Sequence, residues 1–340
     1  MTTTSERRDP MGFENELLPM LTQALQERRE SSVALPRGRV SRRRRWAIGM
    51  SVAASALVIA LLVPIALPGG SGGADPAAAA VLHRVALRAA RQPAVPAPHP
   101  GQFVYTKTQS TQTSVYVTGN GASTNFEFVQ PLTREAWIGI DGSGRIYETA
   151  GDVSFPSAAD QAAWVAAGSP DLGGGDVGDQ TYPAGGLYYL DTSGLPADPQ
   201  ALRDLIEQRQ IVGGPDGDWE TFSIVGDLLR ETSMPPAVRG ALYEVAADLP
   251  GVELVGRIQD GAGHSGVAVA YTHEGVRQEF IFDPTTAELL GENYVQVEDT
   301  TVDVESGGPG AIYPSGKAGT LFFTATYLAS GITDSTDEAP

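Results

Sequence analysis

The chain has 340 residues, of which 41% are hydrophobic, so it can bury a sizeable core and is not globally disordered. It contains no cysteine, which excludes disulfides, thiolate metal sites and cysteine nucleophiles. The formal net charge of -18 is uneven, because residues 1–45 hold ten arginines against six acidic residues whereas the remainder is strongly acidic. The two ends of the chain are therefore expected to face different surroundings.

A charge-free stretch of 22 residues, Trp46–Leu67, is the strongest signal in the sequence. At about 1.5 Å per residue, a helix of this length spans roughly 30 Å, the thickness of the hydrocarbon core of a bilayer. The segment Pro68–Gly73 after it is uncharged, and the residues directly before it are Arg42, Arg43, Arg44 and Arg45. The positive-inside rule therefore predicts a single-pass protein of the cell membrane, with its N-terminus in the cytoplasm and its C-terminal domain outside.

Two other interpretations of this stretch are weaker. A signal peptide, cleaved near Ala74–Ala80, usually has a shorter leader and a shorter apolar segment. A buried helix of a globular domain is seldom apolar on every face over this length or preceded by an arginine cluster. A membrane span fits both the length and the flanking charge.

The predicted cytoplasmic tail contains one helical candidate, Leu17–Arg29. Its apolar residues recur at helical spacing and form a candidate partner-binding face: Leu17, Leu18, Leu21 and Leu25. A cytosolic protein is the expected partner, and a marginal surface helix or membrane-skimming segment is the alternative, because isolated helices of this length are barely stable. The arginines next to the span set topology, and no nucleic-acid partner is expected, since no DNA-binding fold accompanies them.

The outer part of the chain is predicted to begin with a helix over Asp75–Arg91, where Asp75-Pro76 suits a helix N-terminus. After the proline-rich segment Pro93–Pro100, a first strand is expected to start at Gln102. Further strands are predicted over Thr113–Val117, Asn125–Val129, Arg134–Ile140 and Arg145–Thr149, followed by a short helix over Ser157–Gly168 and a glycine-rich acidic loop over Asp171–Asp179. This order predicts an antiparallel meander.

Three helices are predicted next, over Asp198–Gln210, Asp218–Thr232 and Pro235–Leu249. A second meander is predicted over Val252–Ile258, Val267–Tyr271, Val276–Phe282 and Leu289–Val297, with a last strand over Gly319–Tyr327. The expected fold class is α+β, in which an antiparallel sheet carries packed helices. The predicted divisions are a basic tail (1–45), a membrane span (46–67), a linker with a juxtamembrane helix (68–100), an extracytoplasmic domain (101–329) and a flexible terminus (330–340).

Motifs for catalysis or metal binding are weak. The segment Gly263–Val267 has only part of the G-x-S-x-G pattern of hydrolases and lies between two predicted strands. The histidines lack zinc-ligand spacing, and Asp171, Asp176 and Asp179 lack the pattern of a calcium loop. No catalytic residue, metal or cofactor is therefore predicted, and the chain is not expected to be an enzyme.

Several segments together resemble an uncharacterised actinobacterial family of single-pass membrane proteins. They are Pro100–Thr106, Arg134–Arg145, Leu195–Ile206, Met234–Val252 and Ile281–Glu292. The family has no settled activity to transfer. More remotely, the outer domain resembles the half-barrel of bacterial lipoprotein carriers and of periplasmic sigma-factor regulators, which is an analogy of architecture only. In such a half-barrel the helices either shape an apolar groove or fill the core, and the second arrangement is the simpler expectation.

Three functions are compatible with this organisation. The leading hypothesis is a membrane-anchored sensory or regulatory protein that signals to a cytosolic partner such as a sigma factor, although the zinc motif of anti-sigma domains is absent. The alternative is an envelope binding module for a lipid or another apolar ligand. An envelope hydrolase ranks last, because no motif supports it.

Overall fold

The computed structural model describes residues 75–116, 125–172, 178–208, 217–230, 233–300 and 314–340. The predicted tail helix Leu17–Arg29, the arginines Arg42–Arg45 and the predicted span Trp46–Leu67 all lie outside the described residues. Across the described ranges, every helix is too short or too polar to cross a membrane.

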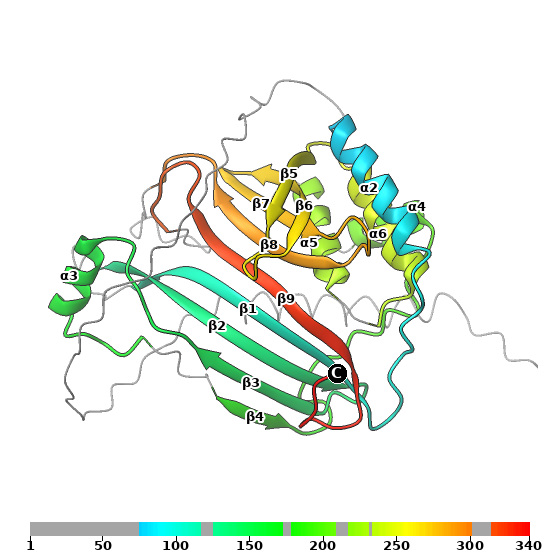
Figure 1. The fold of residues 1–340 in the computed structure, drawn as a ribbon, viewed down its shortest axis with the longest axis horizontal. Helices are drawn as coiled ribbons and strands as arrows, with labels where there is room; N and C mark the ends of the chain where they lie inside the picture. The colour runs from blue at the N-terminus through cyan, green and yellow to red at the C-terminus, as the bar shows by residue number, and fades with distance from the viewer. Residues whose placement is uncertain (1–74, 117–124, 173–177, 209–216, 231–232, 301–313) are drawn as a thin grey trace, which may run out of the picture.

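Nine antiparallel strands form one sheet in the order β4-β3-β2-β1-β9-β8-β7-β6-β5. The strands are β1 (Phe103–Tyr116), β2 (Phe126–Gly139), β3 (Gly144–Ala150), β4 (Asp179–Tyr182), β5 (Glu253–Gln259), β6 (Ser265–His273), β7 (Val276–Phe282), β8 (Leu289–Gln296) and β9 (Leu321–Thr333). The sheet consists of two four-stranded meanders, β1–β4 and β5–β8, and β9 pairs with β1 on one side and with β8 on the other (Figure 1).

Five helices are described: α2 (Pro76–Ala89), α3 (Ala158–Ala166), α4 (Pro199–Glu207), α5 (Gly217–Leu229) and α6 (Pro236–Ala247). Four of them, α2, α4, α5 and α6, gather on the β5–β8 half, whereas α3 lies at the far end of β1 and β2 (Figure 1). The α+β class, the large antiparallel sheet and the packed helices predicted from the sequence are therefore confirmed.

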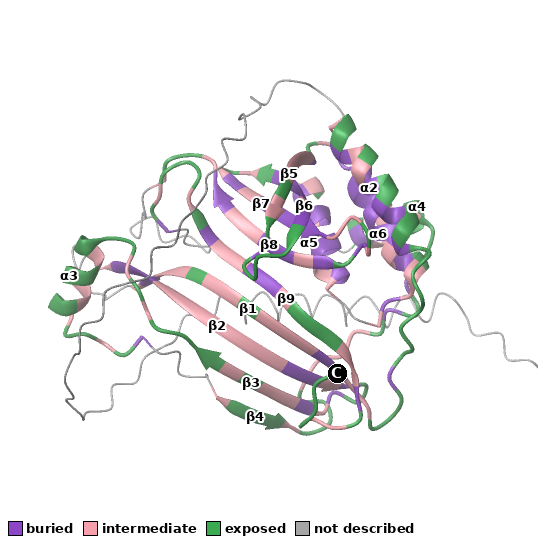
Figure 2. Ribbon diagram, in the orientation of Figure 1, coloured by how far each residue is buried: buried purple, intermediate pink, exposed green. Residues whose placement is uncertain are grey.

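The main hydrophobic core lies between the four gathered helices and one face of the β5–β8 half. Phe280 and Phe282 alternate along β7 and both point into this core, as do Val269 and Tyr271 on β6. Buried residues are concentrated there, while β1–β4 consist largely of half-buried and exposed residues (Figure 2). A smaller core beneath α3 contains Phe126. Among the described residues, the larger core thus lies on the β5–β8 half of the sheet.

Helix α2 begins as its sequence predicts. The Asp75 carboxylate caps it by accepting a hydrogen bond from the Ala77 N–H at 3.0 Å, and Pro76 occupies the first turn. Its small apolar residues, such as Ala86, face α6. A Cβ added at Gly240 of α6 would lie 3.0 Å from the Ala86 carbonyl oxygen, so the glycine permits the close approach of the two helices.

Three features differ from the expectation. First, β1 and β2 are long, continuous strands of 14 residues each where shorter segments were predicted. Second, β4 was not predicted, and it starts at Asp179, at the end of the predicted acidic loop. Third, β9 continues beyond the predicted end of the last strand to Thr333, which pairs with Phe103, and a Cβ added at Gly331 would lie 2.7 Å from Pro340.

Candidate functional site

The helix-facing side of the sheet becomes polar where the helices stop. In the sheet, Thr108 of β1 lies between Tyr327 of β9 on one side and Arg134 of β2 on the other. Tyr327 packs against the main core, so Thr108 and Arg134 lie on the helix-facing side as well. Side chains alternate along a strand, so every second residue of β1 and β2 shares this face. We call the half-buried and exposed polar set the hydroxyl-rich face, which consists of Thr106, Thr108, Ser110, Gln112, Gln130 and Arg134.

A buried ionic cluster borders this face at the end of α5. The Arg230 guanidinium pairs with Asp227, one turn earlier, and with Glu292 on β8. The Tyr327 hydroxyl donates a hydrogen bond to Glu292 Oε1 at 3.1 Å, and Arg230 Cζ lies 6.0 Å from the centre of the Tyr327 ring. We call Asp227, Arg230, Glu292 and Tyr327 the Arg230 network. It connects the helix layer to the two strands that join the halves of the sheet.

Burial and charge fix the protonation states within the network. Burial is the main cause that raises the pKa of Tyr327 well above its usual value, and Glu292 adds to the effect, so the hydroxyl remains a donor. Burial by itself would lower the pKa of Arg230. The attraction of nearby acidic groups, of which Glu292 has the largest effect, is stronger and holds this pKa well above its usual value. The guanidinium therefore remains charged beside the nearly inaccessible Glu292.

Hydrogen bonds extend this polar interior toward β7. The Gln278 side-chain amide donates to the Tyr294 hydroxyl at 2.9 Å, and the Ser223 hydroxyl of α5 donates to Gln278 Oε1 at 2.9 Å. Gln278 is only 1% exposed. Because a buried amide is costly unless it is hydrogen-bonded, this pairing holds α5 in one position over β7 and β8.

The chemistry of the network suits positioning and recognition. Both of its carboxylates pair with Arg230, and its phenol stays protonated, so the network offers hydrogen bonds and charge rather than an activated nucleophile. Arg230 Nε is buried and has no hydrogen-bond partner among the described residues. The hydroxyl-rich face next to it carries donors and acceptors that match a hydrogen-bonding ligand better than a purely apolar one.

The histidines are widely separated in the fold. His83 Nδ1 lies 2.5 Å from the Glu244 carboxylate of α6, and His264 Nδ1 lies 2.9 Å from the buried Asp260 in the β5–β6 turn. The ring of His273 stacks on Trp219 at 5.6 Å. In the part of the chain that the structure describes, no three His, Asp or Glu residues come together as metal ligands.

One of the three aspartates considered as calcium ligands, Asp179, has an arginine partner instead. Asp179 pairs with Arg145 at 2.7 Å, which depresses the pKa of the Asp179 carboxyl. Asp176 lies outside the described residues. The partial hydrolase motif Gly263–Val267 runs from the β5–β6 turn into β6, where Asp260 accepts hydrogen bonds from the Ala262 and His264 N–H groups. These contacts are those of a turn.

Comparison of the sequence with models of known protein families gave no match, and comparison with curated proteins gave none either. The assignment of function therefore depends on the geometry of the chain itself.

Proposed function

We propose that this chain is a membrane-anchored extracytoplasmic sensory or regulatory protein. In this proposal Trp46–Leu67 spans the membrane, Arg42–Arg45 keep the tail in the cytoplasm, and the outer domain transmits a signal to a cytosolic protein, for which a sigma factor is one candidate. The sheet and its helices would form a half-barrel, with the hydroxyl-rich face on its concave side. The observation that carries the proposal is the way in which α2 is built into the core.

Helix α2 is the first described element after the predicted span, and only residues 68–74 separate the span from Asp75, the residue that caps the helix. The Asp75 N–H donates to the Val252 carbonyl at 3.0 Å, and Asp75 Oδ2 accepts from the Leu254 N–H at 3.3 Å. Seven residues reach at most about 25 Å when fully extended. The helix layer would therefore sit close to the membrane, and a displacement of α2 would be passed to the span.

The input of such a sensor would be a polar ligand on the hydroxyl-rich face. Tyr327 lies opposite Thr108 of that face and bonds Glu292, and Glu292 bonds Arg230 at the end of α5. Helix α5 packs with α6, and α6 packs with α2. A ligand that shifts β1 against β9 would thus act on a continuous series of packed elements that leads to the span.

The test is affinity purification of the full-length protein from mildly solubilised native membranes, followed by mass spectrometry. We expect a cytosolic protein that is retained by the full chain and lost when residues 17–29 are deleted. Substitution of the four leucines by alanine is the matched control for loss of the apolar face without loss of length. Recovery of the same cytosolic proteins with and without residues 17–29, or of none, would overturn the proposal.

A second function, an envelope binding module whose tail only sets topology, is favoured by the hydroxyl-rich face. Its polar side chains point to a glycan or an extended peptide as the ligand rather than a lipid chain. Native mass spectrometry of the purified full-length protein would show a retained polar molecule. Replacing Thr108 and Ser110 with valine should release that molecule, whereas retention of a lipid by both proteins would exclude a polar ligand.

A further inference from the structure

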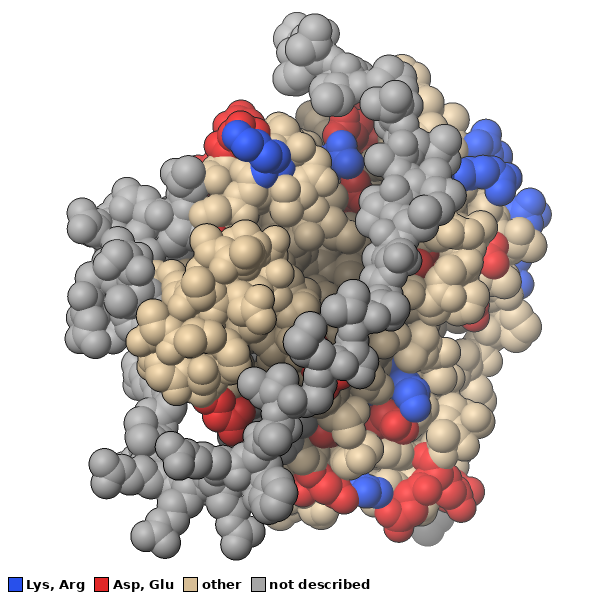
Figure 3. All heavy atoms as spheres, turned by 60° about the vertical axis from the view of Figure 1, so that its left-hand side comes forward, with Lys and Arg blue, Asp and Glu red and all other residues tan. Residues whose placement is uncertain are grey.

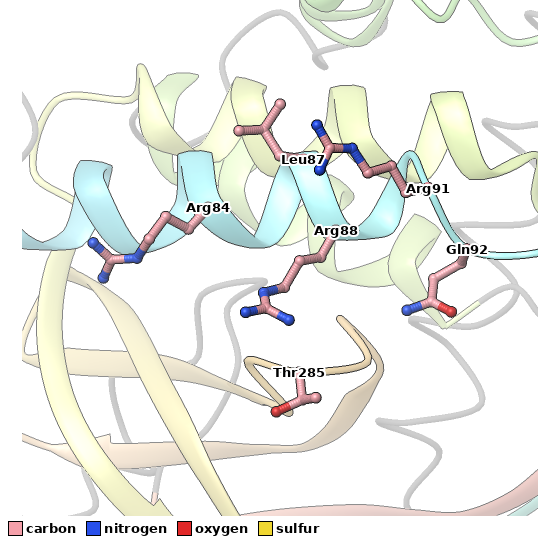
Figure 4. Close-up of a pocket in the computed structure, with 6 residues that line it drawn as sticks. All are labelled: Arg84, Leu87, Arg88, Arg91, Gln92 and Thr285. Atoms are coloured by element: carbon pink, nitrogen blue, oxygen red, sulfur yellow. The ribbon is translucent and has the colours of Figure 1, made fainter.

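The outward face of α2 is basic. Arg84, Leu87 and Arg88 lie on this face at helical spacing, and Arg91 follows just after the Ala90 cap. With Gln92 and Thr285 they line an open pocket of about 500 Å³ (Figure 4). Arg88 extends from the helix toward Thr285 in the β7–β8 turn, while the Arg91 side chain runs back along the helix toward Leu87 (Figure 4). We call Arg84, Leu87, Arg88 and Arg91 the α2 basic face.

These arginines are unlike most other basic residues of the domain. Elsewhere in the described chain, seven Lys and Arg side chains pair with carboxylates: Lys107, Arg134, Arg145, Arg203, Arg230, Arg277 and Lys317. Arg84, Arg88 and Arg91 have no such partner among the described residues, and α2 itself contains no Asp or Glu. In a protein of net charge -18 this leaves an uncompensated cationic face.

The distribution of charge on the surface agrees with this. In Figure 3, one group of Lys and Arg lies along the upper right edge of the molecule, and the other visible Lys and Arg lie next to Asp or Glu. An anionic surface would attract the domain by this edge and repel the remainder, so the charges would also orient it.

An exposed leucine lies among the arginines. The Leu87 side chain is 56% exposed, which makes it one of the most exposed large apolar residues of the described chain. Helices that rest on a membrane combine an apolar side chain, which enters the headgroup region, with basic side chains that bind phosphate groups. Arginine suits this role because its planar guanidinium binds a phosphate through two hydrogen bonds.

We propose that the α2 basic face docks on anionic phospholipid headgroups of the outer leaflet. This inference rests on the proposed topology, in which only residues 68–75 lie between the span and α2, so the face is held within reach of those headgroups at a high effective concentration. A soluble polyanion has no such tether and must approach against the negative charge of the whole domain. Docking would fix the outer domain in one orientation above the membrane.

The absence of cysteine from the chain permits a site-specific test. A Leu87→Cys variant of the full-length protein is labelled with an environment-sensitive nitrobenzoxadiazole dye and placed in nanodiscs, either of phosphatidylcholine alone or with phosphatidylglycerol added. We expect a blue shift of the emission and quenching by spin-labelled lipid in the anionic discs only. High salt should reverse both, because contacts between exposed charges are screened.

Two matched controls accompany the probe. The triple substitution Arg84→Gln, Arg88→Gln and Arg91→Gln should abolish the response of the dye. Arg257→Gln is the control for loss of an arginine and should preserve the response, because Arg257 lies on β5. Like the three arginines, it is exposed and has no carboxylate partner among the described residues. A dye at Val165→Cys on α3, where the side chain is 58% exposed, should not respond to lipid composition.

Failure of this inference and failure of the proposed topology are distinguishable. Protein that does not enter nanodiscs would contradict the span. Protein that enters them, but whose dye at position 87 gives the same spectrum in both lipid compositions, overturns the docking alone. The same shift produced in phosphatidylcholine discs by soluble glycerol phosphate would also overturn it, because the face would then be a site for a free anion.

Discussion

The indole nitrogen of Trp137 in β2 donates a hydrogen bond of 2.6 Å to the main-chain carbonyl oxygen of Glu338, two residues before the C-terminus. The neighbouring Arg145 of β3 donates to the Thr336 carbonyl at 3.0 Å and pairs with Asp337 at 2.8 Å. The last seven residues therefore cover the face of β2 and β3 opposite to the hydroxyl-rich face, although their composition resembles that of a frayed end.

Truncation after Thr333 should destabilise the protein. It removes the acceptor of the Trp137 indole and two partners of Arg145, the Thr336 carbonyl and the Asp337 carboxylate, and each lost hydrogen bond costs about 1 kcal/mol. Thermal unfolding of the full-length protein in mild detergent should show a lower midpoint, and Trp137 should be more accessible to acrylamide. Asp337→Asn is the control: it weakens one exposed ion pair and should have little effect. An unchanged midpoint after truncation would show that this segment does not contribute to stability.

Replacement of Arg230 should be among the most damaging single changes. Arg230→Met leaves the buried Glu292 carboxylate without its counter-charge, which typically costs about 3–5 kcal/mol. Adding Glu292→Gln removes the stranded charge and should recover most of the loss. Urea unfolding of the two single variants and the double variant measures the coupling between them. Additive losses would mean that the two side chains do not stabilise each other.

Glu135 should make stability depend on pH in the acid range. The Tyr105 hydroxyl bonds its carboxylate at 2.7 Å, and this bond, with help from Lys107, lowers the pKa of Glu135 below its ordinary 4.5. A lowered folded-state pKa gives stability that is present above the unfolded pKa and is lost as pH falls through the folded value. Glu135→Gln should therefore lower the unfolding midpoint at pH 7, and its difference from the parent should shrink as pH falls below 4.5 and vanish once pH lies below the folded-state pKa. A difference independent of pH would contradict this origin.

The charge of Glu127 should destabilise the folded protein, in contrast to that of Glu135. Burial raises the pKa of Glu127 above 4.5, and the nearby Asp160 adds to the effect, so the charged form is disfavoured in the folded state. Glu127→Gln retains an oxygen that can accept the Ser315 N–H, which now bonds the carboxylate at 2.7 Å. At pH 7 the variant should have a higher thermal unfolding midpoint than the parent protein. This difference should decrease as pH falls toward 4.5, because Glu127 of the parent then becomes protonated. A lower midpoint at pH 7 would show that the charge itself is needed.

Gly226 is expected to tolerate no side chain. A Cβ at this position of α5 would lie 1.9 Å from Cζ of Phe280, so Gly226→Ala must displace the ring or the helix. Overpacking of this kind costs about 1–3 kcal/mol. The double variant with Phe280→Leu should recover part of the loss in a urea titration. A Gly226→Ala protein as stable as the parent would mean that α5 shifts without cost.

The helices and the second meander could be predicted from the sequence because their signals are local. Asp75-Pro76 and Asp198-Pro199 each mark a helix start, and the apolar alternation of β6 and β7 marks buried strands. The centre of β1 could not be predicted, because Lys107–Gln112 are all polar and both faces of the strand there are partly exposed. Its continuity becomes clear only from its pairing with β2 and β9.

The candidate site was missed for a related reason. Gln278 and Glu292 are polar residues within strands, and a sequence pattern places such residues on a solvated face. The structure turns both toward α5, where Ser223 and Arg230 pair with them. The break in apolar alternation at these two positions was the available signal. The span, the tail helix and the topology lie outside the described residues and stay predictions.

The position of β9 also determines when the protein can fold. Among the described strands it is the last in sequence and the only one that pairs with both meanders, so β1 and β8 keep open edges until residues 321–333 have been synthesised. Open edges invite pairing with other chains. Until β9 has been made, the two meanders lack the strand that joins them, and a chain that stops before it would be a substrate for proteolysis or aggregation rather than a shorter version of the same fold.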